Sequence, residues 1–249
     1  MSGAGKTVLI TGAAKRLGRA LALDAAKHGW NVAIHYNGSE DEARQTVADV
    51  RAFGVKSTMV KADLGREEDV ARLVAKAGPL NALINNASIF EFDDWRSTTR
   101  ESWDRHMEIN LRAPFVLSQA FANQLGKDEQ GGIINIIDQR VLKPTPQFMS
   151  YSLSRAGLHW LTRTLAQALA PQVRVNAVAP GPSFIGARQS QENYDKQRAS
   201  TILERGAEVE DLVRAVRYLL EATSVTGEMI AVDGGQHLAW QSPDVLVQE

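Results

Sequence analysis

Residues 7–20 read TVLITGAAKRLGRA, a short β-branched run that leads through a turn with glycine into a segment of helical period. A strand, a glycine turn and a helix in this order are typical of the first unit of a dinucleotide-binding α/β fold. Gly12 permits a tight turn, and Gly18 permits close backbone approach where the helix starts. The helix N-terminus would offer free N–H groups and a positive dipole end to a pyrophosphate. Ordinary strand-to-helix turns also contain glycines, so the rest of the chain has to decide between the two interpretations.

The alternation of the first unit repeats along the chain. Further strand-like runs cover 31–36, 56–63, 80–86, 132–138, 173–179 and 228–234. Segments of helical period lie at 17–29, 39–54, 66–77, 101–125, 151–169 and 208–221. This order predicts a parallel sheet covered by helices on both faces. No linker rich in Pro, Gly or Ser divides the chain, so we expect an α/β fold, a single doubly wound Rossmann domain over 1–249 with a seven-stranded parallel sheet.

The composition argues against several classes of function. The chain has 249 residues, a formal net charge of −1 and no cysteine. A charge this close to zero gives no broad basic field for nucleic acid or a membrane surface. No apolar run approaches the roughly 18 residues that a membrane span needs. The absence of cysteine removes disulfides, thiolate nucleophiles and Cys-based metal sites, and it favours a cytoplasmic protein. We therefore expect a small-molecule substrate, and no metal, nucleic acid or membrane.

The end of the second strand bears on the choice of cofactor. In a doubly wound sheet, ligands bind beyond the carboxyl ends of the strands. The second strand ends IHYNGS, without the Asp or Glu that would take the ribose 2′-hydroxyl of NAD. Arg16, Lys15, His35 and Ser39 would instead hold a 2′-phosphate, which predicts NADPH. Two alternatives remain open here, because His35 would also fit as a strand-end histidine with no ligand, and Ser39 can cap the next helix.

Seven motifs in order make the chain resemble the short-chain dehydrogenase/reductase family. They are TG…G at 11–18, ADL at 62–64, NNAS at 85–88, IN at 109–110, Tyr151 with its following cation, PG at 180–181 and VDGG at 232–235. The stretches TGAAKRLGRA, IHY..S and NNASIF, together with Asp138, closely resemble the pteridine reductases and the bacterial dihydromonapterin reductases within that family. The resemblance implies a substrate lid at about 182–206 and a homo-oligomer, either a tetramer or a dimer. It also implies cofactor contacts from Thr11, Gly12, Arg16, Leu17, Gly18, His35, Tyr36, Asn37, Ser39, Asp63, Leu64, Asn86, Ala87, Ser88, Tyr151, Arg155, Pro180, Gly181 and Ser183.

The resemblance also assigns catalytic roles. It implies hydride transfer from C4 of the nicotinamide to an electron-poor carbon, with Tyr151 delivering a proton to the neighbouring atom. The pKa of a free tyrosine is about 10, so a nearby cation would help by stabilising the phenolate. Arg155 lies four residues later, on the same helix face, where the family carries lysine. Arginine keeps the charge but does not readily pass protons. Asn110 resembles the asparagine that supports the structure behind the cation.

Asp138 stands 13 residues before Tyr151, at a position where most family members have serine. An ionised carboxylate would repel an oxygen that becomes negative, which disfavours a ketone as substrate. A pterin instead has N–H and amino donors that a carboxylate accepts, and its C=N nitrogen gains a proton that a carboxylic acid could deliver. The resemblance further implies that Phe90 stacks the pterin against the nicotinamide, and Arg16 would touch both a phosphate and the pterin edge.

These residues predict an NADPH-dependent reductase of a dihydropterin, of the dihydromonapterin or dihydrobiopterin type. Its substrate residues would be Arg16, Phe90, Asp138 and Tyr151. Two alternatives remain. An NADP-dependent carbonyl or 3-ketoacyl reductase needs Tyr151 but is poorly served by Asp138. A catalytically impaired NADP-binding protein would account for Arg155.

Overall fold

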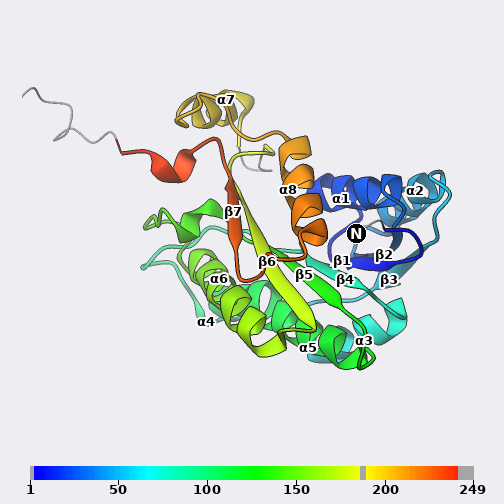
Figure 1. Cartoon of the computed structure of the whole chain (residues 1–249). Coiled ribbons are helices and arrows are strands. Elements are labelled where there is room, and N and C mark those ends of the chain that lie inside the picture. The colour runs from blue at the N-terminus through cyan, green and yellow to red at the C-terminus, as the bar shows by residue number, and fades with distance from the viewer. Residues whose placement is uncertain (1–2, 186–188, 241–249) are drawn as a thin grey trace, which may run out of the picture.

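Seven parallel strands form one twisted sheet at the centre of the computed structural model, which describes residues 3–185 and 189–240 (Figure 1). The strands are β1 (Thr7–Ile10), β2 (Asn31–Tyr36), β3 (Ser57–Lys61), β4 (Ala82–Asn85), β5 (Gly131–Ile136), β6 (Val173–Pro180) and β7 (Met229–Val232). Their order in the sheet is β3-β2-β1-β4-β5-β6-β7. The predicted Rossmann sheet is confirmed, and each strand lies within about three residues of its expected range. The strand order reverses between β1 and β4, so the crevice for a ligand should open there.

Helices cover both faces of the sheet (Figure 1). One face carries α1 (Arg16–Lys27), α2 (Glu40–Arg51) and α8 (Val209–Glu221). The opposite face carries α3 (Glu67–Ala77), α5 (Ala113–Gln124) and α6 (Met149–Leu169). The remaining elements are α4 (Arg100–Met107), a π-helical turn η1 (Glu108–Arg112), the 3₁₀ turns η2 (Gln139–Val141) and η3 (Gln236–Leu238), and α7 (Gln191–Ala199). None of the helices within the described ranges is long and apolar enough to cross a membrane.

Successive strand residues divide the core into two layers. Val8 and Ile10 of β1 pack with α1, α2 and α8, whereas Leu9 between them packs with α3 and α5 on the other side. All three side chains are fully buried. A parallel sheet that is covered on both faces needs apolar residues at consecutive positions, which is why the strands appear in the sequence as continuous apolar runs.

Two helical predictions needed correction. The single helix expected at 101–125 is α4, the turn η1 and α5, because one wider π turn interrupts the helix around Asn110. The segment 182–206, expected as a weakly periodic lid, contains α7, in which no residue is buried. A helix without a buried apolar stripe leaves no periodic signal in the sequence. Residues 186–188 of that segment lie outside the described residues, and the lid itself stays a prediction.

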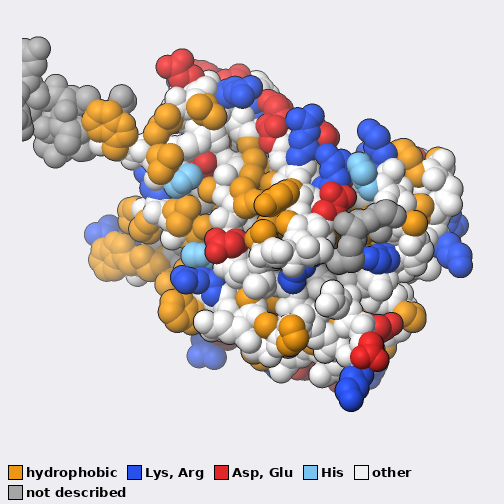
Figure 2. Space-filling view, in the orientation of Figure 1, with side chains coloured by type: hydrophobic (Ala, Val, Ile, Leu, Met, Phe, Trp, Pro, Cys, Tyr) orange, Lys and Arg blue, Asp and Glu red, His pale blue; other side chains and the backbone are white. Residues whose placement is uncertain are grey.

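Charged side chains of both signs are interspersed on the face that Figure 2 shows, and no continuous basic area covers it. This distribution agrees with a net charge of −1. We therefore expect a small-molecule site in the crevice between the ends of β1 and β4.

Candidate active site

The turn between β1 and α1 brings backbone atoms unusually close together. Gly12 has a φ of 64°, in the left-handed region that favours glycine. A β-carbon at Gly18 would lie 2.1 Å from the carbonyl oxygen of Gly12 and 2.8 Å from Cα of Ala13, so no larger residue fits. Arg16, the first residue of α1, has a φ of 54°, a strained conformation that non-glycine residues keep mostly at functional sites. The turn is built to expose the amino end of α1.

His35 supports this turn from the end of β2. The backbone N–H of Gly12 donates to Nδ1 of His35 at 3.0 Å, and Nε2 of His35 lies 3.1 Å from the carbonyl oxygen of Ala62. Since Nδ1 accepts, Nε2 must carry the hydrogen. Burial lowers the pKa of His35 to about 4, so the ring is neutral at pH 7. Both ring nitrogens are engaged within the protein and the ring is neutral, so this geometry gives no support to the expectation that His35 holds a 2′-phosphate.

A second clamp joins the ends of β1 and β4. The hydroxyl of Thr11 accepts the backbone N–H groups of Asn86 and Ala87, both at 2.9 Å. The side-chain amide of Asn86 donates back to the carbonyl oxygen of Thr11 at 2.8 Å. Thr11 is buried, so its side chain holds the two strand ends together and does not face the crevice.

A cavity of about 430 Å³ opens at this point of the sheet. Eleven of the predicted cofactor residues line it: Gly12, Arg16, Leu17, Gly18, His35, Asn37, Asp63, Leu64, Asn86, Ala87 and Ser88. Lys15, Ile89, Ile109 and Phe184 complete the wall. Tyr36, by contrast, is buried, and Ser39 precedes α2 without making a side-chain cap. The capping role that the sequence suggested for Ser39 is absent.

Arg16 and Lys15 bring positive charge to this cavity. The guanidinium of Arg16 lies over the ring of Phe184, 5.1 Å from its centroid, and donates to the carbonyl oxygen of Ile185 at 3.4 Å. Among the residues that the structure describes, Lys15 forms one ion pair, a distant one at the surface, 3.7 Å from Glu42. The free amino end of α1, the glycine cradle and these two cations form a site that suits a phosphorylated dinucleotide.

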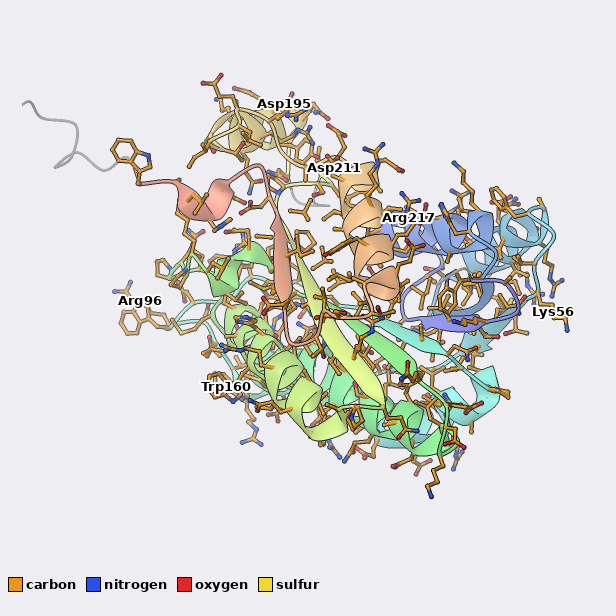
Figure 3. The ribbon with its side chains drawn as sticks, in the orientation of Figure 1. Lys56, Arg96, Trp160, Asp195, Asp211 and Arg217 are labelled. Carbon is orange, nitrogen blue, oxygen red and sulfur yellow. The ribbon has the colours of Figure 1, made fainter. Side chains whose placement is uncertain are left out.

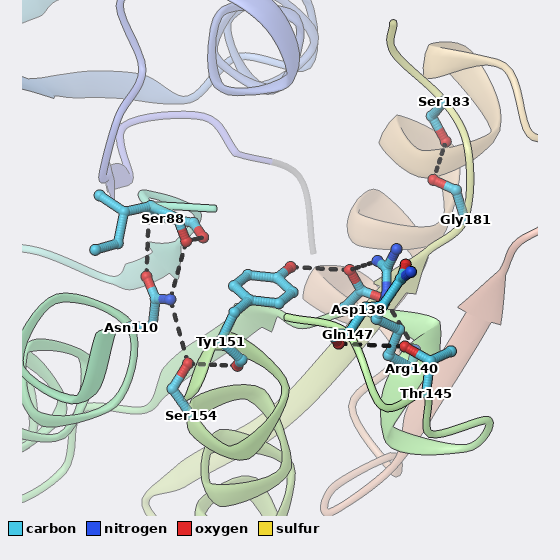
Figure 4. Close-up of polar contacts among 11 residues, drawn as sticks. Ser88, Asn110, Asp138, Arg140, Thr145, Gln147, Tyr151, Ser154, Gly181 and Ser183 are labelled. Carbon is cyan, nitrogen blue, oxygen red and sulfur yellow. Dashed lines mark hydrogen bonds and ion pairs between the residues drawn. The ribbon is translucent and has the colours of Figure 1, made fainter. Parts of the chain in front are cut away.

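Tyr151 and Asp138 meet at the carboxyl end of β5 (Figure 4). The hydroxyl of Tyr151 donates to Oδ2 of Asp138 at 2.8 Å. Arg140 supplies two further donors to the same carboxylate, its backbone N–H to Oδ1 at 2.8 Å and its Nη1 to Oδ2 at 3.1 Å. Three donors around one carboxylate are the surroundings of an ionised acceptor. In this arrangement the proton of the pair rests on Tyr151.

Tyr151 is buried, and this burial is the main reason why its pKa is raised above the ordinary value of 10.0. The negative charge of Asp138 raises this pKa further, whereas Arg155 acts in the opposite direction. The guanidinium carbon of Arg155 lies 5.2 Å from the centroid of the Tyr151 ring, and its Nη1 donates to the carbonyl oxygen of Ile136 at 3.3 Å. Arg155 is thus a buried, fixed cation beneath the tyrosine, as the i, i+4 spacing predicts.

Asn110 lies within the π turn and reaches two segments of the site. Its Oδ1 accepts from the backbone N–H of Ile89, and its Nδ2 donates to the carbonyl oxygen of Ile89, both at 3.0 Å. Nδ2 also lies 3.2 Å from the hydroxyl of Ser154, one helical turn after Tyr151. The π turn therefore directs Asn110 at the join between the loop after β4 and helix α6.

Phe90 lies at the mouth of the site, where 43% of its surface is exposed. Its ring packs edge-on to Tyr151, with centroids 4.7 Å apart, and stacks on Phe148 at 4.3 Å. The guanidinium carbon of Arg140 lies 5.3 Å from the centroid of Phe90 and 5.4 Å from that of Phe148. Arg140 and Phe148 were not among the site residues predicted from the sequence. Only the position of Arg140, two residues after Asp138, gave a signal for either of them.

Pro180 is the last residue of β6. Gly181 and Ser183 follow it on another side of the site (Figure 4). The backbone N–H of Gly181 donates to the carbonyl oxygen of Val232 at 3.0 Å, and the hydroxyl of Ser183 donates to the carbonyl oxygen of Gly181 at 3.3 Å. These three residues do not line the cavity. Within the described part of the chain, no group of three or more His, Cys, Asp or Glu side chains could hold a metal ion.

Replacing His35 with Gln should make the protein less sensitive to mild acid. The folded state disfavours protonated His35, whereas the unfolded chain takes up a proton near pH 6.5. Because the unfolded chain binds a proton at His35 that the folded protein excludes, the free energy of unfolding of the wild type should fall by about 2 kcal/mol between pH 7 and pH 5. Urea unfolding at both pH values tests this. His159→Gln is the comparison, because burial also lowers the pKa of this half-buried histidine but His35 is kept, so most of the loss should remain. An equal loss in the wild type and His35→Gln would contradict the prediction.

Known proteins resemble this chain along most of its length. A family model described as short chain dehydrogenase matches residues 6–196. The chain is 46% identical to FolM alternative dihydrofolate reductase 1 from Brucella canis, whose crystal structure is complexed with NADP, with a TM-score of 0.94 over 98% of both chains. It is 30% identical to a blue fluorescent protein from a metagenomic library, in complex with NADPH, with a TM-score of 0.87 over 94% of this chain and 99% of that one.

Two sequence relatives cover the chain equally well. The 3-oxoacyl-(acyl-carrier-protein) reductase FabG of Staphylococcus epidermidis is 32% identical over 94% of this chain and 99% of its own. A short-chain type dehydrogenase/reductase of Picea abies is 32% identical over 93% of this chain and 92% of its own. Because the family model matches most of the chain and these relatives align along nearly all of it, the chain belongs to the short-chain dehydrogenase family and is an oxidoreductase.

Proposed function

We propose that this chain is an NADPH-dependent reductase that reduces the C=N bond of a dihydropterin, of the dihydromonapterin or dihydrobiopterin type. The observation that carries the proposal is the hydrogen bond from Tyr151 to Asp138 beside Phe90. It combines a proton donor, an acceptor for N–H groups and an aromatic face within one small site. The FolM structure from Brucella canis, named as an alternative dihydrofolate reductase, supports a reaction on this class of ring.

The residues that line the cavity fit NADPH. Only glycine fits at position 18, where the amino end of α1 would take the pyrophosphate. Lys15 and Arg16 would hold the 2′-phosphate, and Asn37 at the end of β2 brings no acidic side chain that would repel it. NADP or NADPH in the related structures supports this choice of cofactor. When bound, NADPH would supply the hydride.

Four side chains of this chain would do the rest. Tyr151 would release its proton to the ring nitrogen. Its raised pKa keeps the phenol protonated at neutral pH before the reaction. Asp138 would accept hydrogen bonds from the N–H and amino groups of the pterin, which orients the ring. Phe90 would cover one face of the ring and exclude water. Arg155 would stabilise the phenolate once the proton has left.

A second function has its own support. The FabG relative is named for the reduction of a 3-oxoacyl group, and Arg140 places a cation beside Asp138 that offsets part of its negative charge. A ketone oxygen that becomes negative would meet less repulsion near this pair than near an unpaired carboxylate. A carbonyl or 3-ketoacyl reductase is therefore the alternative against which the pterin proposal is tested.

We also propose that the protein is a homo-oligomer, a dimer or tetramer. Trp160 and Leu153 lie seven residues apart on α6 and expose 69% and 46% of their surfaces (Figure 3). Large apolar side chains grouped on one outward helix face are typical of an interface. The cytoplasmic location expected from the lack of cysteine stays a prediction.

A substrate panel tests the proposed function directly. Purified protein with NADPH should oxidise the cofactor in the presence of dihydropterins, and more slowly or not at all with simple ketones and 3-ketoacyl thioesters. The loss of NADPH absorbance is the measurement, and NADH in place of NADPH is the comparison for the cofactor. Tyr151→Phe sets the baseline, because losing the general acid should lower the rate by about 10²–10⁴-fold. Turnover of ketones alone would assign the chain to the alternative function.

Replacing Asp138 with Ser should reverse the substrate preference. The variant loses a charge-assisted acceptor for the pterin, so pterin turnover should fall by about 10–100-fold. It gains a hydroxyl that can donate to a developing oxyanion, so ketone turnover should rise. Asp138→Asn serves as the control of equal size, and kcat/KM for one pterin and one ketone is the measurement. Unchanged pterin turnover in the Ser variant would refute the role of the carboxylate.

Replacing Arg155 with Lys tests the departure from the family's usual residue. Either side chain would place a positive charge beneath the Tyr151 ring, so we expect activity equal to or above that of the wild type. Arg155→Met removes the charge and should lower kcat while leaving pterin binding in place. Steady-state kinetics of the three proteins checks this order. If Lys creates activity in a protein that otherwise has none, the natural chain is better described as a binder of NADPH.

A further inference from the structure

Helix α6, which carries Tyr151, begins in an unusual way. Its N-cap residue, Phe148, has a φ of 58° and makes no side-chain cap. The first amides of a helix need acceptors from elsewhere. Here Asp93 provides them from a distant segment, because its carbonyl oxygen accepts from the N–H of Met149 at 3.3 Å and its Oδ1 accepts from the N–H of Ser150 at 3.1 Å. The carboxylate also lies at the positive end of the helix dipole.

The contact between Asp93 and Ser150 lies inside the protein. Asp93 is 2% exposed, and Ser150 and His106 are fully buried. The hydroxyl of Ser150 donates to Oδ2 of Asp93 in a short hydrogen bond. A buried carboxylate is costly unless its oxygens are paired, and the start of α6 supplies the close donors to this one. Loss of the carboxylate would therefore release the first turn of the helix.

His106 extends this contact to the loop after β4. Its Nε2 accepts from the backbone N–H of Glu91 at 3.3 Å, so its Nδ1 carries the hydrogen. Nδ1 lies 2.7 Å from the hydroxyl of Ser150 and 3.0 Å from the carbonyl oxygen of Ser102. The Ser150 hydroxyl thus accepts from His106 while it donates to Asp93. Burial lowers the pKa of His106, which agrees with a neutral ring in these roles.

The loop from Ile89 to Asp93 is consequently fixed at three points. Asn110 holds Ile89 through two hydrogen bonds, His106 holds the N–H of Glu91, and Asp93 binds the start of α6. Phe90 lies between the first two points, and Tyr151 directly follows Ser150. The distance between the aromatic face and the proton donor therefore depends on the Asp93 contact.

We propose that Asp93 is a positioning residue, which holds Tyr151 at a fixed place relative to Phe90 by capping α6 from the loop that carries Phe90. This inference rests on the proposed function only in that Tyr151 is the proton donor and Phe90 the aromatic face. It assigns Asp93 no contact with substrate or cofactor.

The test compares Asp93→Asn with Asp94→Asn. Asp94 is the matched control, because among the described residues its carboxylate accepts hydrogen bonds from Arg96 and Ser97 within its own turn and from no residue of α6. In Asp93→Asn, kcat for the substrate that the wild type reduces should fall by about 10–100-fold, the scale of a small misplacement of reacting groups. The solvent deuterium isotope effect on kcat should rise, because proton transfer from Tyr151 becomes slower. NADPH affinity and the activity of Asp94→Asn should not change.

Two further measurements test the proposal even if the substrate is not a dihydropterin or if Asp93→Asn folds poorly. Amide hydrogen exchange over 149–152 should become faster in Asp93→Asn and not in Asp94→Asn, with or without a known substrate. Ser150→Ala should lower kcat, as Asp93→Asn does. Ser150→Thr, which keeps the hydroxyl, should have a kcat closer to that of the wild type. A wild-type kcat and isotope effect in a folded Asp93→Asn, or unchanged exchange over 149–152, would overturn the proposal. If the wild type does not reduce pterins but Asp93→Asn still shows faster exchange over 149–152, the proposed function is contradicted and the role of Asp93 is not.

Discussion

The hydrogen bond between the buried Tyr151 and the partly buried Asp138 is the constraint on which the rest of the site depends. It joins the carboxyl end of β5 to the start of α6 and brings a phenol and a carboxylate within 2.8 Å. A partly buried carboxylate needs compensation, and Arg140 provides it from the turn that follows Asp138 directly. Arg140 in turn packs on Phe90 and Phe148. The residue that balances the charge of Asp138 is thus also the one that packs on the two aromatic rings of the site.

The sheet could be predicted from the sequence because burial on both faces leaves a strong local signal. Strands such as β5 are apolar at consecutive positions, and glycines mark the ends of several helices, so the positions of the strands and their parallel direction followed from pattern alone. The interruption of 101–125 could not be predicted, since a π turn inserts one residue without changing the residue types around it. Helix α7 was missed because most of its residues are polar and none of them is buried, so it has no apolar face that the sequence could show.

The site was predictable only where a motif fixes both the residue and its direction. The turn around Gly12 and the spacing of Tyr151 and Arg155 are of this kind, since each is set by local backbone geometry. His35 was assigned to a phosphate because it ends a strand, yet its ring turns back to the glycine turn. Asp93 gave no signal, because its partners lie 57 residues away in the sequence. A residue type shows what a side chain can do, but the tertiary structure decides what it faces.

The two departures from the usual family pattern become consistent when they are considered together. With lysine at position 155, a proton could pass along the cation beside the tyrosine, whereas arginine is a permanent charge and cannot take this part. With serine at position 138, the phenol would have a neutral neighbour, whereas here it donates to a carboxylate. In the proposed reaction, Arg155 would therefore stabilise the phenolate from beneath while Asp138 holds the donors of a nitrogen ring. The carboxylate would suit a ketone less well, because a negative charge beside the reacting oxygen opposes its reduction, whereas the loss of the lysine relay affects either substrate equally.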